Sequence, residues 1–496
     1  MAADGQSPNP DPTVADAVYD DPSPISVSDA AYDDVALMSV AEAVYWTDDL
    51  TAEPEGFADD GSGDVTVSSA EGLAWLAVLT NGLNGQEADT FEGKTVTLLN
   101  DIDLSGKLWT SIGKYKDKHI GRGNFDIIHD TPFKGTFDGG NNTIEGLDIN
   151  IIIDEDIDVR VFNTGLFGKL AENGSIRDLT ISGATISGDS HIGAVAGAIE
   201  NGVIENVNTS DCSITARGSR AGGIAGLSLG FVSISNCNIS GLNISAASGE
   251  AGGIIGCVQG IGNVISSCTV SGSQVETDGE KAGGIVGFLY EYFRTENDLE
   301  ISRCSFNGTV SAKELAGGIA GQFLPDNDYS ISECFVDAEI TAEDSAGGIA
   351  GSARNIVNCY SKGKVTATDW GAGGITEEGS VKSSYSTAIV NGKIYPGGIT
   401  GSRSSAYQIV DCLALNPSVA AEESEYYDYN RVFPVHETIS GNGEFVRNAA
   451  TGQRNYAYSD MRLSEGEKLI YCPAKERKLS GGDGEDVTYE ELADES

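Results

Sequence analysis

Ala221-Gly-Gly-Ile-Ala-Gly226 is the stretch of sequence that decides the fold, because close relatives of it return along the chain at a nearly constant spacing. The nine glycine phrases end at Gly168, Gly197, Gly226, Gly256, Gly287, Gly321, Gly351, Glu377 and Gly401. The steps between these endings are 29, 29, 30, 31, 34, 30, 26 and 24 residues. A repeat of this length indicates stacked supersecondary units, each of which buries its apolar residues against its neighbours.

A second column of residues follows the first at the same period. About ten residues after each phrase, an I-x-polar segment ends at Leu147, Leu179, Val207, Cys237, Cys268, Cys304, Cys334, Cys359, Tyr385 and Cys412. Each unit therefore offers three strand-length pieces rich in Ile, Val and Thr, separated by Gly, Ser, Asn and Asp, and no helix-length apolar stripe. This pattern predicts an all-β fold, a parallel β-solenoid in which like residues stack at about 4.8 Å.

The cysteines of the second column are interpreted as a buried apolar ladder. The ladder contains Cys237, Cys268, Cys304, Cys334, Cys359 and Cys412. The alternative is a set of disulfides. In-register parallel strands hold Cβ atoms about 4.8 Å apart, outside the usual range of about 3.5–4.5 Å for a bridge, which favours free thiols. The total of nine cysteines also leaves at least one without an intramolecular partner.

At these residues the chain resembles a known family. Gly165-Leu-Phe-Gly168 and the Gly-Gly-Ile-x-Gly phrases resemble the GLUG repeat, and residues 133–144 are similar to the segment that opens such arrays. Similar flanking segments extend the resemblance over residues 64 to about 465. It implies a right-handed parallel β-helix on secreted or wall-attached bacterial proteins, often called adhesins, and it carries no catalytic residues. Glu377 and Tyr385 depart from the pattern, one in place of a glycine and the other in place of a column cysteine.

Composition divides the chain into five parts. The first segment holds fifteen acidic residues with no Lys or Arg, so we expect disorder there and in the acidic end. A helix over about 69–83, with Leu73 and Leu76 on one stripe, is expected to cap the stack. The expected parts are a disordered acidic segment 1–63, an N-terminal cap and first coil 64–132, β-helix repeats 133–415, an irregular closing coil and C-terminal cap 416–470, and an acidic tail 471–496.

Insertions between the strands are expected to project as loops and to supply the ligand contacts. These insertions are 115–130, 151–160, 288–299 and 407–443. The candidate contact residues are Tyr290, Tyr292, Phe293, Tyr426, Tyr427 and Tyr429. The alternative is that these aromatic rings fold back over the flank of the stack. The acidic clusters 154–158 and 326–328 are candidates for calcium, but neither shows the EF-hand loop pattern, so solvated acidic loops are favoured and no cofactor is expected.

Motifs for chemistry are scarce. The four histidines, His119, His129, His191 and His436, have no metal-ligand spacing, and H-E-x-x-H is absent. Gly226-Leu-Ser-Leu-Gly230 matches G-x-S-x-G in letters, but it straddles a repeat glycine and no helix follows it. The formal net charge of −45 excludes nonspecific binding to nucleic acid.

The sequence has neither a secretory signal after Met1 nor a membrane span, and we expect export and anchor signals to lie outside it; a cytosolic protein is the alternative. We expect a non-enzymatic, secreted or cell-surface adhesin or stalk that displays binding loops. Its expected partner is a host or bacterial surface glycan or protein, and we expect no membrane insertion. A carbohydrate-active enzyme with a cleft along a β-helix is the first alternative. A passive wall or spacer protein is the second.

Overall fold

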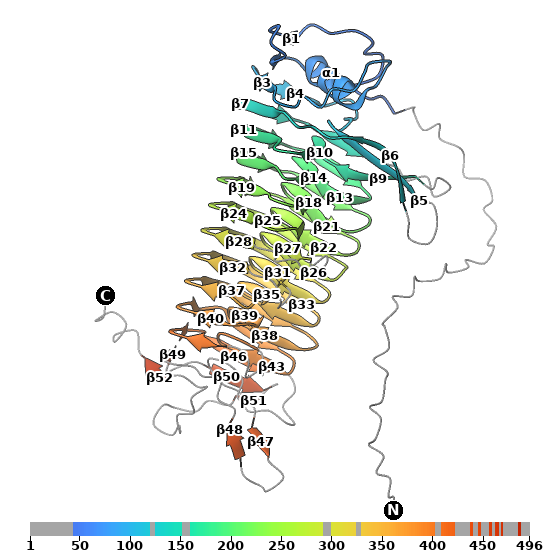
Figure 1. Ribbon diagram of the computed structural model, residues 1–496. Coiled ribbons are helices and arrows are strands. Elements are labelled where there is room, and N and C mark those ends of the chain that lie inside the picture. Colours follow the sequence, from blue (N-terminus) through green and yellow to red (C-terminus); the bar gives the residue numbers. More distant parts are fainter. Residues whose placement is uncertain are drawn as a thin grey trace, which may run out of the picture. The chain divides into compact units, whose positions relative to one another are not determined.

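The computed structural model describes residues 43–119, 125–150, 159–290, 299–323, 329–401 and 408–421, together with short strands between residues 437 and 487 (Figure 1). The chain divides after Ala43, and every element below belongs to the unit that begins at Val44. This unit is built of parallel strands in stacked sheets, and among the described residues it contains one α-helix. The arrangement is consistent with a β-helix or solenoid.

Two of the sheets take one strand from each repeat unit. The eight-stranded sheet contains β10 (Phe167–Ala171), β14 (Ala196–Glu200), β18 (Ala225–Leu229), β23 (Ile255–Gln259), β27 (Val286–Leu289), β31 (Ala320–Phe323), β35 (Ala350–Ser352) and β39 (Thr376–Glu378). The eleven-stranded sheet contains β6 (Phe125–Thr131), β5 (Lys114–His119), β9 (Val159–Thr164), β13 (Ser190–Gly193), β17 (Ala221–Gly222), β22 (Glu250–Gly252), β26 (Lys281–Gly283), β30 (Leu315–Gly317), β34 (Ser345–Gly347), β38 (Gly371–Gly373) and β43 (Tyr395–Gly397).

The third sheet is larger and takes two or three strands from each unit. Its first strands in each unit are β7 (Thr136–Glu145), β11 (Ser175–Ser182), β15 (Val203–Ser210), β19 (Ser233–Ser235), β24 (Asn263–Ser266), β28 (Leu299–Ser302), β32 (Tyr329–Ser332), β36 (Ile356–Val357), β40 (Val381–Lys382) and β44 (Ile409–Val410). The strands that follow are β8 (Asp148–Asn150), β12 (Thr185–Gly188), β16 (Ser213–Ala216), β20 (Asn238–Ser240), β21 (Asn243–Ala246), β25 (Thr269–Thr277), β29 (Ser305–Ala312), β33 (Phe335–Ala342), β37 (Tyr360–Ala367), β41 (Tyr385–Ser386), β42 (Ile389–Gly392), β45 (Leu413–Ala414) and β46 (Ser418–Ala421).

Short strands lie before and after the repeats. They are β1 (Phe57–Asp59), β2 (Val65–Val67), β3 (Thr95–Leu98), β4 (Ile102–Asp103), β47 (Glu437–Ile439), β48 (Phe445–Arg447), β49 (Tyr456–Tyr458), β50 (Arg462–Glu465), β51 (Lys468–Leu469) and β52 (Glu485–Val487). Strands β49 and β50 pair in parallel with β45 and β46, so the stacking continues past residue 421.

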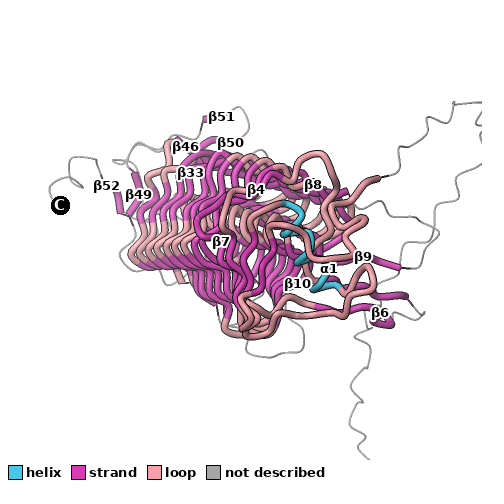
Figure 2. The backbone as a smooth tube through the Cα atoms, turned by 90° about the horizontal axis from the view of Figure 1, so that it is seen from above, coloured by secondary structure: helices cyan, strands magenta, loops and turns pink. Residues whose placement is uncertain are grey.

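Isoleucine columns form the core between the sheets. From the third glycine phrase on, the isoleucine of the phrase is fully buried, and the N–H groups from Ile224 to Ile375 each donate to the isoleucine carbonyl of the next unit, as from Ile224 to Ile254 at 3.0 Å. The members of this column are Ile224, Ile254, Ile285, Ile319, Ile349, Ile375 and Ile399. Figure 2 looks down the stack, where the strands of successive units lie behind one another. One apolar core therefore runs from the first repeat to the last.

The last glycine of each phrase is required by close approach of two backbones. A Cβ atom on Gly226 would lie 2.2 Å from Ile192 N and 2.3 Å from the carbonyl carbon of His191. Both are backbone atoms of the preceding unit, so they cannot rotate away as a flexible side chain would. The repeat pattern alone allows two reasons for these glycines, a backbone with positive φ or the close approach of a neighbouring backbone. At Gly226 the reason is the close approach.

A left-handed residue marks another corner of each unit, directly before the cysteine column. Its φ lies between 49° and 57° throughout. The residues are Asp178, Asn206, Asn236, Ser267, Arg303, Glu333, Asn358, Ser383 and Asp411. Asn and Asp adopt this conformation at low cost, whereas Arg303 and Glu333 are held in it by the pairing of the strands on both sides.

Helix α1 (Ala70–Asn81) lies within the predicted range of 69–83. The Ser69 hydroxyl caps it by accepting the Gly72 N–H at 3.1 Å, and Gly82 ends it in the left-handed conformation with φ 59°. Leu73 and Leu76 are fully buried and join the main core. The helix thus packs its leucines on the apolar residues of the first strands, and its role as a cap stays a prediction.

Residues 43–63 correct the predicted extent of the disordered segment, which we placed over 1–63. Here β1 pairs antiparallel with β2, and β2 continues into the stack by parallel pairing with β3. The Trp46 indole donates to Leu104 O at 2.9 Å and packs on the core, and Phe57 is buried. Two aromatic side chains supply the apolar burial that the acidic composition concealed. Residues 1–42 and the predicted acidic tail, apart from β52, lie outside the described residues.

The insertion at 115–130 is more regular than predicted. Strands β5 and β6 form an antiparallel hairpin, and β5 pairs antiparallel with β9 at the edge of the eleven-stranded sheet. The hairpin extends this sheet beyond the first repeat (Figure 1). The other three insertions lie wholly or mostly outside the described residues.

The close approach of the backbones at Gly226 can be tested by adding one methyl group, through substitution with alanine. We expect Gly226→Ala to lower the free energy of unfolding by about 2 kcal/mol or more, because overpacking against rigid backbone is costly. Urea denaturation followed by circular dichroism measures this loss. Gly272→Asn is the control, since Gly272 has φ +57° and open space, and Asn tolerates that conformation. A loss at Gly226 no larger than at Gly272 contradicts the close-packing account.

Candidate functional site

A charged column runs along the corner where the eight-stranded and eleven-stranded sheets meet. Its members come from successive strands of the eleven-stranded sheet. They are Asn163, His191, Arg220, Glu250 and Lys281, which we call the corner column. A small apolar cluster of Ala198, Leu227, Cys257 and Phe288 comes from the other sheet. The Lys281 ammonium lies 4.8 Å from the Phe288 ring centroid, which shows that the two groups of side chains face each other.

Hydrogen bonds and an ion pair connect the corner column from Asn163 to Glu250, and Lys281 has ion pairs of its own. His191 Nδ1 is 2.9 Å from Asn163 Oδ1, and Arg220 Nη1 is 3.0 Å from His191 Nε2. Since Arg220 can only donate, Nε2 accepts and Nδ1 carries the proton. Arg220 Nε is 3.6 Å from Glu250 Oε2, and Lys281 pairs with Glu280 and with Glu314 at 3.7 Å. Each charged member therefore has an opposite charge beside it.

The corner column contains no group prepared for acid–base or nucleophilic chemistry near neutral pH. Burial, assisted by the neighbouring Arg220 guanidinium, lowers the pKa of His191 to about 3, and both of its ring nitrogens are engaged. Burial raises the pKa of Cys257 to about 12, so its thiol stays protonated. Burial also raises the pKa of Glu250, although Arg220 and Lys281 oppose this. The geometry is that of a structural ion-pair chain.

Glu377 stands where other units have glycine, and the structure shows what accommodates it. A Cβ atom on Gly371 would lie 2.9 Å from Glu377 Oε1. The position of Gly371 is occupied by Ser345 in the preceding unit and by Leu315 in the unit before that. Glu377 thus fills space that a side chain from the neighbouring strand fills elsewhere. Its carboxyl group is buried, and burial, followed by the charge of Glu378, raises its pKa to about 8.

The predicted cysteine ladder lies in the core, and its members are buried free thiols. Each thiol lies close to the carbonyl oxygen two residues earlier, as for Cys304 and Ser302 at 3.4 Å. Cys212 and Cys257 are likewise free and buried, and Cys472 lies outside the described residues. No disulfide joins the described cysteines, which agrees with the preference for free thiols.

Tyr385 is not a member of the cysteine column, which corrects our alignment by one residue. Tyr385 pairs with Tyr360, so Ser384 stands opposite Cys359. The Cys359 N–H donates to Ser384 Oγ at 3.0 Å. Ser384 Oγ in turn donates to Lys382 O at 2.8 Å, the carbonyl two residues earlier. A hydroxyl has nearly the shape of a thiol and makes the same contact, which explains why serine fits the ladder.

Of the aromatic residues that we predicted as ligand contacts, the structure describes only Tyr290. Tyr290 is half-buried, and its ring packs edge-on against Phe288, 5.8 Å between centroids, beside the corner column. It folds back over the flank, which was the alternative interpretation. Tyr292, Phe293, Tyr426, Tyr427 and Tyr429 lie outside the described residues, as do the acidic clusters 154–158 and 326–328.

Three adjacent rings that the sequence analysis missed lie on the outer face of the large sheet, one pair tilted and the other stacked. Phe335, Tyr360 and Tyr385, the aromatic ladder, have centroids 5.2 and 4.2 Å apart. Phe335 and Tyr385 are each 40% exposed. In earlier units the same column holds only small polar residues. These are Thr180, Asn208, Asn238, Thr269 and Ser305.

The surroundings of the aromatic ladder resemble a protein-binding surface. The ion pairs Lys362–Asp337 (2.9 Å) and Lys364–Glu339 (3.2 Å) run beside it on the same strands, and exposed Ile389 pairs with Lys364. Tyr360 and Tyr385 stack face to face, whereas Phe335 is tilted against Tyr360 by 33°. Interfaces between proteins are enriched in aromatic residues at their centre and in polar residues around it.

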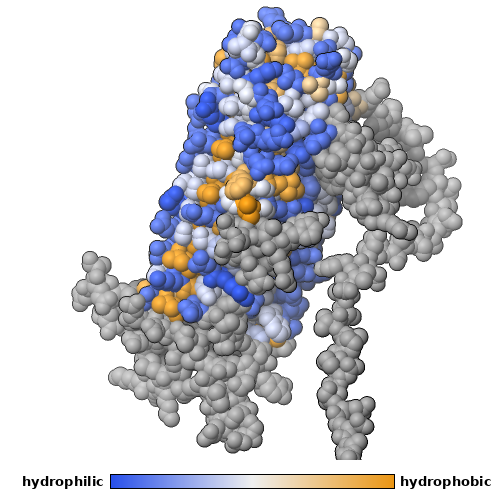
Figure 3. Space-filling model, in the orientation of Figure 1, coloured by the Kyte–Doolittle hydropathy of each residue, from blue (hydrophilic) through white to orange (hydrophobic). Residues whose placement is uncertain are grey.

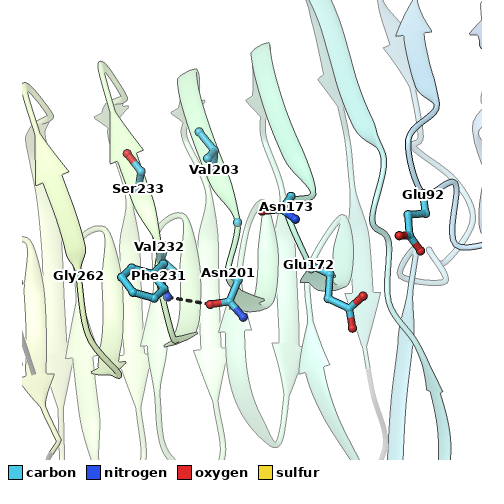
Figure 4. A pocket seen from close by; sticks show the side chains of 10 residues that line it. Glu92, Glu172, Asn173, Asn201, Val203, Phe231, Val232, Ser233 and Gly262 are labelled. Carbon is cyan, nitrogen blue, oxygen red and sulfur yellow. Dashed lines mark hydrogen bonds between the residues drawn. The ribbon is translucent and has the colours of Figure 1, made fainter. Parts of the chain in front are cut away.

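A groove with a volume of about 620 Å³ crosses successive units at the turns that lead into the large sheet (Figure 4). Exposed Phe231 lies towards one end, and the carboxylates Glu172 and Glu92 lie towards the other, with Asn201 between. We call it the Phe231 groove. None of its described lining residues is Arg or Lys, although Lys134, from the unit between those of Glu92 and Glu172, pairs with Glu172 at 2.5 Å. The sequence offered one signal, an aromatic residue in a turn that uses Asn or Gly in neighbouring units.

Figure 3 shows apolar side chains gathered at a few places on an otherwise polar face. Exposed large apolar side chains include those of both surfaces described above. They are Val203, Phe231 and Ile261 near the groove, and Phe335, Tyr385 and Ile389 at the ladder. Exposed apolar groups that cluster in this way indicate interaction surfaces more than isolated ones do.

No group of three or more His, Cys, Asp or Glu residues in the described ranges is arranged to hold a metal ion. Helix α1 has twelve residues, and no helix in the described part of the chain is long and apolar enough to cross a bilayer.

Comparison with known proteins gives limited likenesses. No family model matches the chain. A stretch of 136 residues is 32% identical to halomucin of Haloquadratum walsbyi, which covers 25% of this chain and 1% of halomucin. Among solved structures, a proposed immunoglobulin A1 protease from Bacteroides ovatus covers 87% of this chain and 86% of its own, with a TM-score of 0.34 and 17% identity.

The buried Glu377 carboxyl makes stability depend on pH. Its folded pKa of about 8 lies above the unfolded value near 4.5, so the folded state binds more protons between these values and stability falls as pH rises through them. We expect Glu377→Gln to stabilise the protein at pH 8.5 by up to about 5 kcal/mol, since one pKa unit is about 1.4 kcal/mol. The difference should vanish at pH 4. Thermal unfolding at both values measures it.

Exposed Glu205 provides the matched control, because Glu205→Gln removes a carboxylate from the surface. We expect this variant to follow the wild type at both pH values. A Glu377→Gln variant whose stability relative to wild type does not change with pH contradicts the burial of a neutral carboxyl group.

Proposed function

We propose that the protein is a non-enzymatic, adhesin-type protein of the bacterial surface or surroundings, which presents binding surfaces on a right-handed parallel β-helix of GLUG type. The repeat phrases and the parallel stacking support this assignment. The partial likeness to halomucin is compatible with a location outside the cell. On this proposal the stack is a rigid scaffold, and its function lies in the side chains on its outer faces.

The observation that carries the proposal is the aromatic ladder. Its column is polar over five successive units and becomes aromatic in the next three, without any change in strand pairing. The scaffold does not require aromatic residues there, because Thr and Ser occupy the same place in earlier units. Three adjacent rings on an outward position therefore point to a partner outside the chain.

A carbohydrate-active enzyme is the second candidate, and one observation favours it. Glu92 and Glu172 line the same groove, and glycosidases use paired carboxylates. Against it, Glu172 is exposed and paired with Lys134, whereas a general acid needs burial to raise its pKa. Among the described residues, the groove also has no lining Arg or Lys that would neutralise an acidic polysaccharide, as a lyase requires.

Replacement of the aromatic ladder by threonine tests the proposal. The variant Phe335→Thr, Tyr360→Thr, Tyr385→Thr restores the residue type of Thr180 and Thr269 in the same column, so the sheet should still form. We expect the full chain to bind at least one component of a matrix-protein and glycan array, and the variant to lose at least tenfold in affinity for a protein ligand. Surface plasmon resonance gives the affinities.

Trp370→Ala is the control, because it removes an exposed aromatic ring elsewhere. Binding that survives in the threonine variant contradicts the role of the ladder. If the protein binds nothing on the array, the result supports the alternative of a passive spacer protein. Release of shorter sugars from a polysaccharide supports the enzyme.

A further inference from the structure

We propose that the Phe231 groove is a binding site for a linear, uncharged glycan. This inference rests on the proposed function, and it assigns a ligand class to a surface separate from the aromatic ladder.

The Phe231 ring is held in place and still open to solvent. It is 58% exposed. A Cβ atom on Gly262 would lie 2.4 Å from Phe231 Cδ1, so the ring rests against the glycine of the next unit. The Phe231 N–H donates to Asn201 Oδ1 at 2.9 Å, which fixes the turn that carries the ring. An aromatic ring presented in this way attracts the polarised C–H groups of a sugar through its negative face.

Polar groups follow the ring along the groove. Asn201 uses its oxygen to hold Phe231, which leaves its amide nitrogen as a donor towards the groove, and Asn173 lies exposed in the preceding unit. The carboxylates of Glu172 and Glu92 lie at the far end and can accept hydrogen bonds from a ligand (Figure 4). Amide donors and carboxylate acceptors next to an aromatic ring match the hydroxyl groups and apolar face of a pyranose.

The groove runs along the stack. The turns that carry Gly262, Phe231, Asn201 and Asn173 belong to successive units, and backbone bonds join these turns. Successive units are about 4.8 Å apart, which is comparable with the length of one pyranose unit. A linear glycan laid along the groove would therefore meet an equivalent turn at each sugar. A branched or globular ligand would not use this regularity.

The negative charge of the groove and of the whole chain favours an uncharged ligand over an acidic one. Lys134 neutralises Glu172, while Glu92 adds a negative charge, and the whole chain carries a formal net charge of −45. An acidic polysaccharide would be repelled by this field. A neutral glycan needs no counter-charge and would gain from the ring and the hydrogen-bonding groups.

Isothermal titration calorimetry of the full chain with three hexasaccharides tests the inference. The probes are cellohexaose and N-acetylchitohexaose, which are neutral, and hexagalacturonate, which is acidic. We expect at least one neutral probe to bind and hexagalacturonate not to bind. We expect Phe231→Ala to weaken that binding at least tenfold, and Asn201→Ser, which shortens the amide, to weaken it by a smaller factor.

The matched control is Trp370→Ala, which removes an exposed ring that belongs to neither the Phe231 groove nor the aromatic ladder and should leave the sugar affinity unchanged. Circular dichroism of each variant confirms that the stack is folded. Equal affinity of wild type and Phe231→Ala, or binding of the acidic probe alone, overturns the inference. Failure of every sugar also overturns it, and then protein binding lost in the threonine variant of the ladder would still uphold the proposed function.

Discussion

Parallel hydrogen bonding between equivalent residues of successive units is the constraint on which the rest of the structure depends. The N–H and C=O groups of a strand bond to the equivalent strands of the neighbouring units, which lie about 4.8 Å away, so the residue at any position must fit directly against its own counterparts. The isoleucine column shows the consequence in the core, where one side-chain type recurs from Ile224 to Ile399. The corner column shows it for charge, because Arg220, Glu250 and Lys281 alternate in sign along the stack.

Departures from the repeat are tolerated where a neighbour adjusts. Glu377 replaces a glycine that close approach otherwise requires, and Gly371 supplies the missing space. Ser384 replaces a cysteine and keeps its contact with the carbonyl two residues earlier. Both substitutions preserve the strand pairing, and one of them leaves a buried carboxyl group whose protonation is coupled to folding. Outward positions have no such restriction, which is why the aromatic ladder and Phe231 can differ from their counterparts.

The sequence predicted those features that repeat and missed those that occur once. Glycine and cysteine columns carried the period, so the parallel stack, the free thiols and the capping helix could be inferred. Tyr385 was placed one residue out because Ser384 does not look like a cysteine until the strand pairing is known. Phe231 and Phe335 follow no period, and their importance depends on exposure, which composition does not report. Residues 43–63 are ordered because Trp46 and Phe57 pack on the core, and the acidic composition of the segment hid this contribution.

The central claim, in-register stacking, is tested most directly by distances between spin labels on one outward column. Asn150, Thr215, Thr341 and Asn391 belong to this column, and the native cysteines of the described part of the chain are buried. Double electron–electron resonance should give distances near 19 Å for Thr215–Thr341, 29 Å for Asn150–Thr341 and 38 Å for Asn150–Asn391, about 4.8 Å for each of four, six and eight steps. Distances that do not grow in proportion to the number of units would contradict the account.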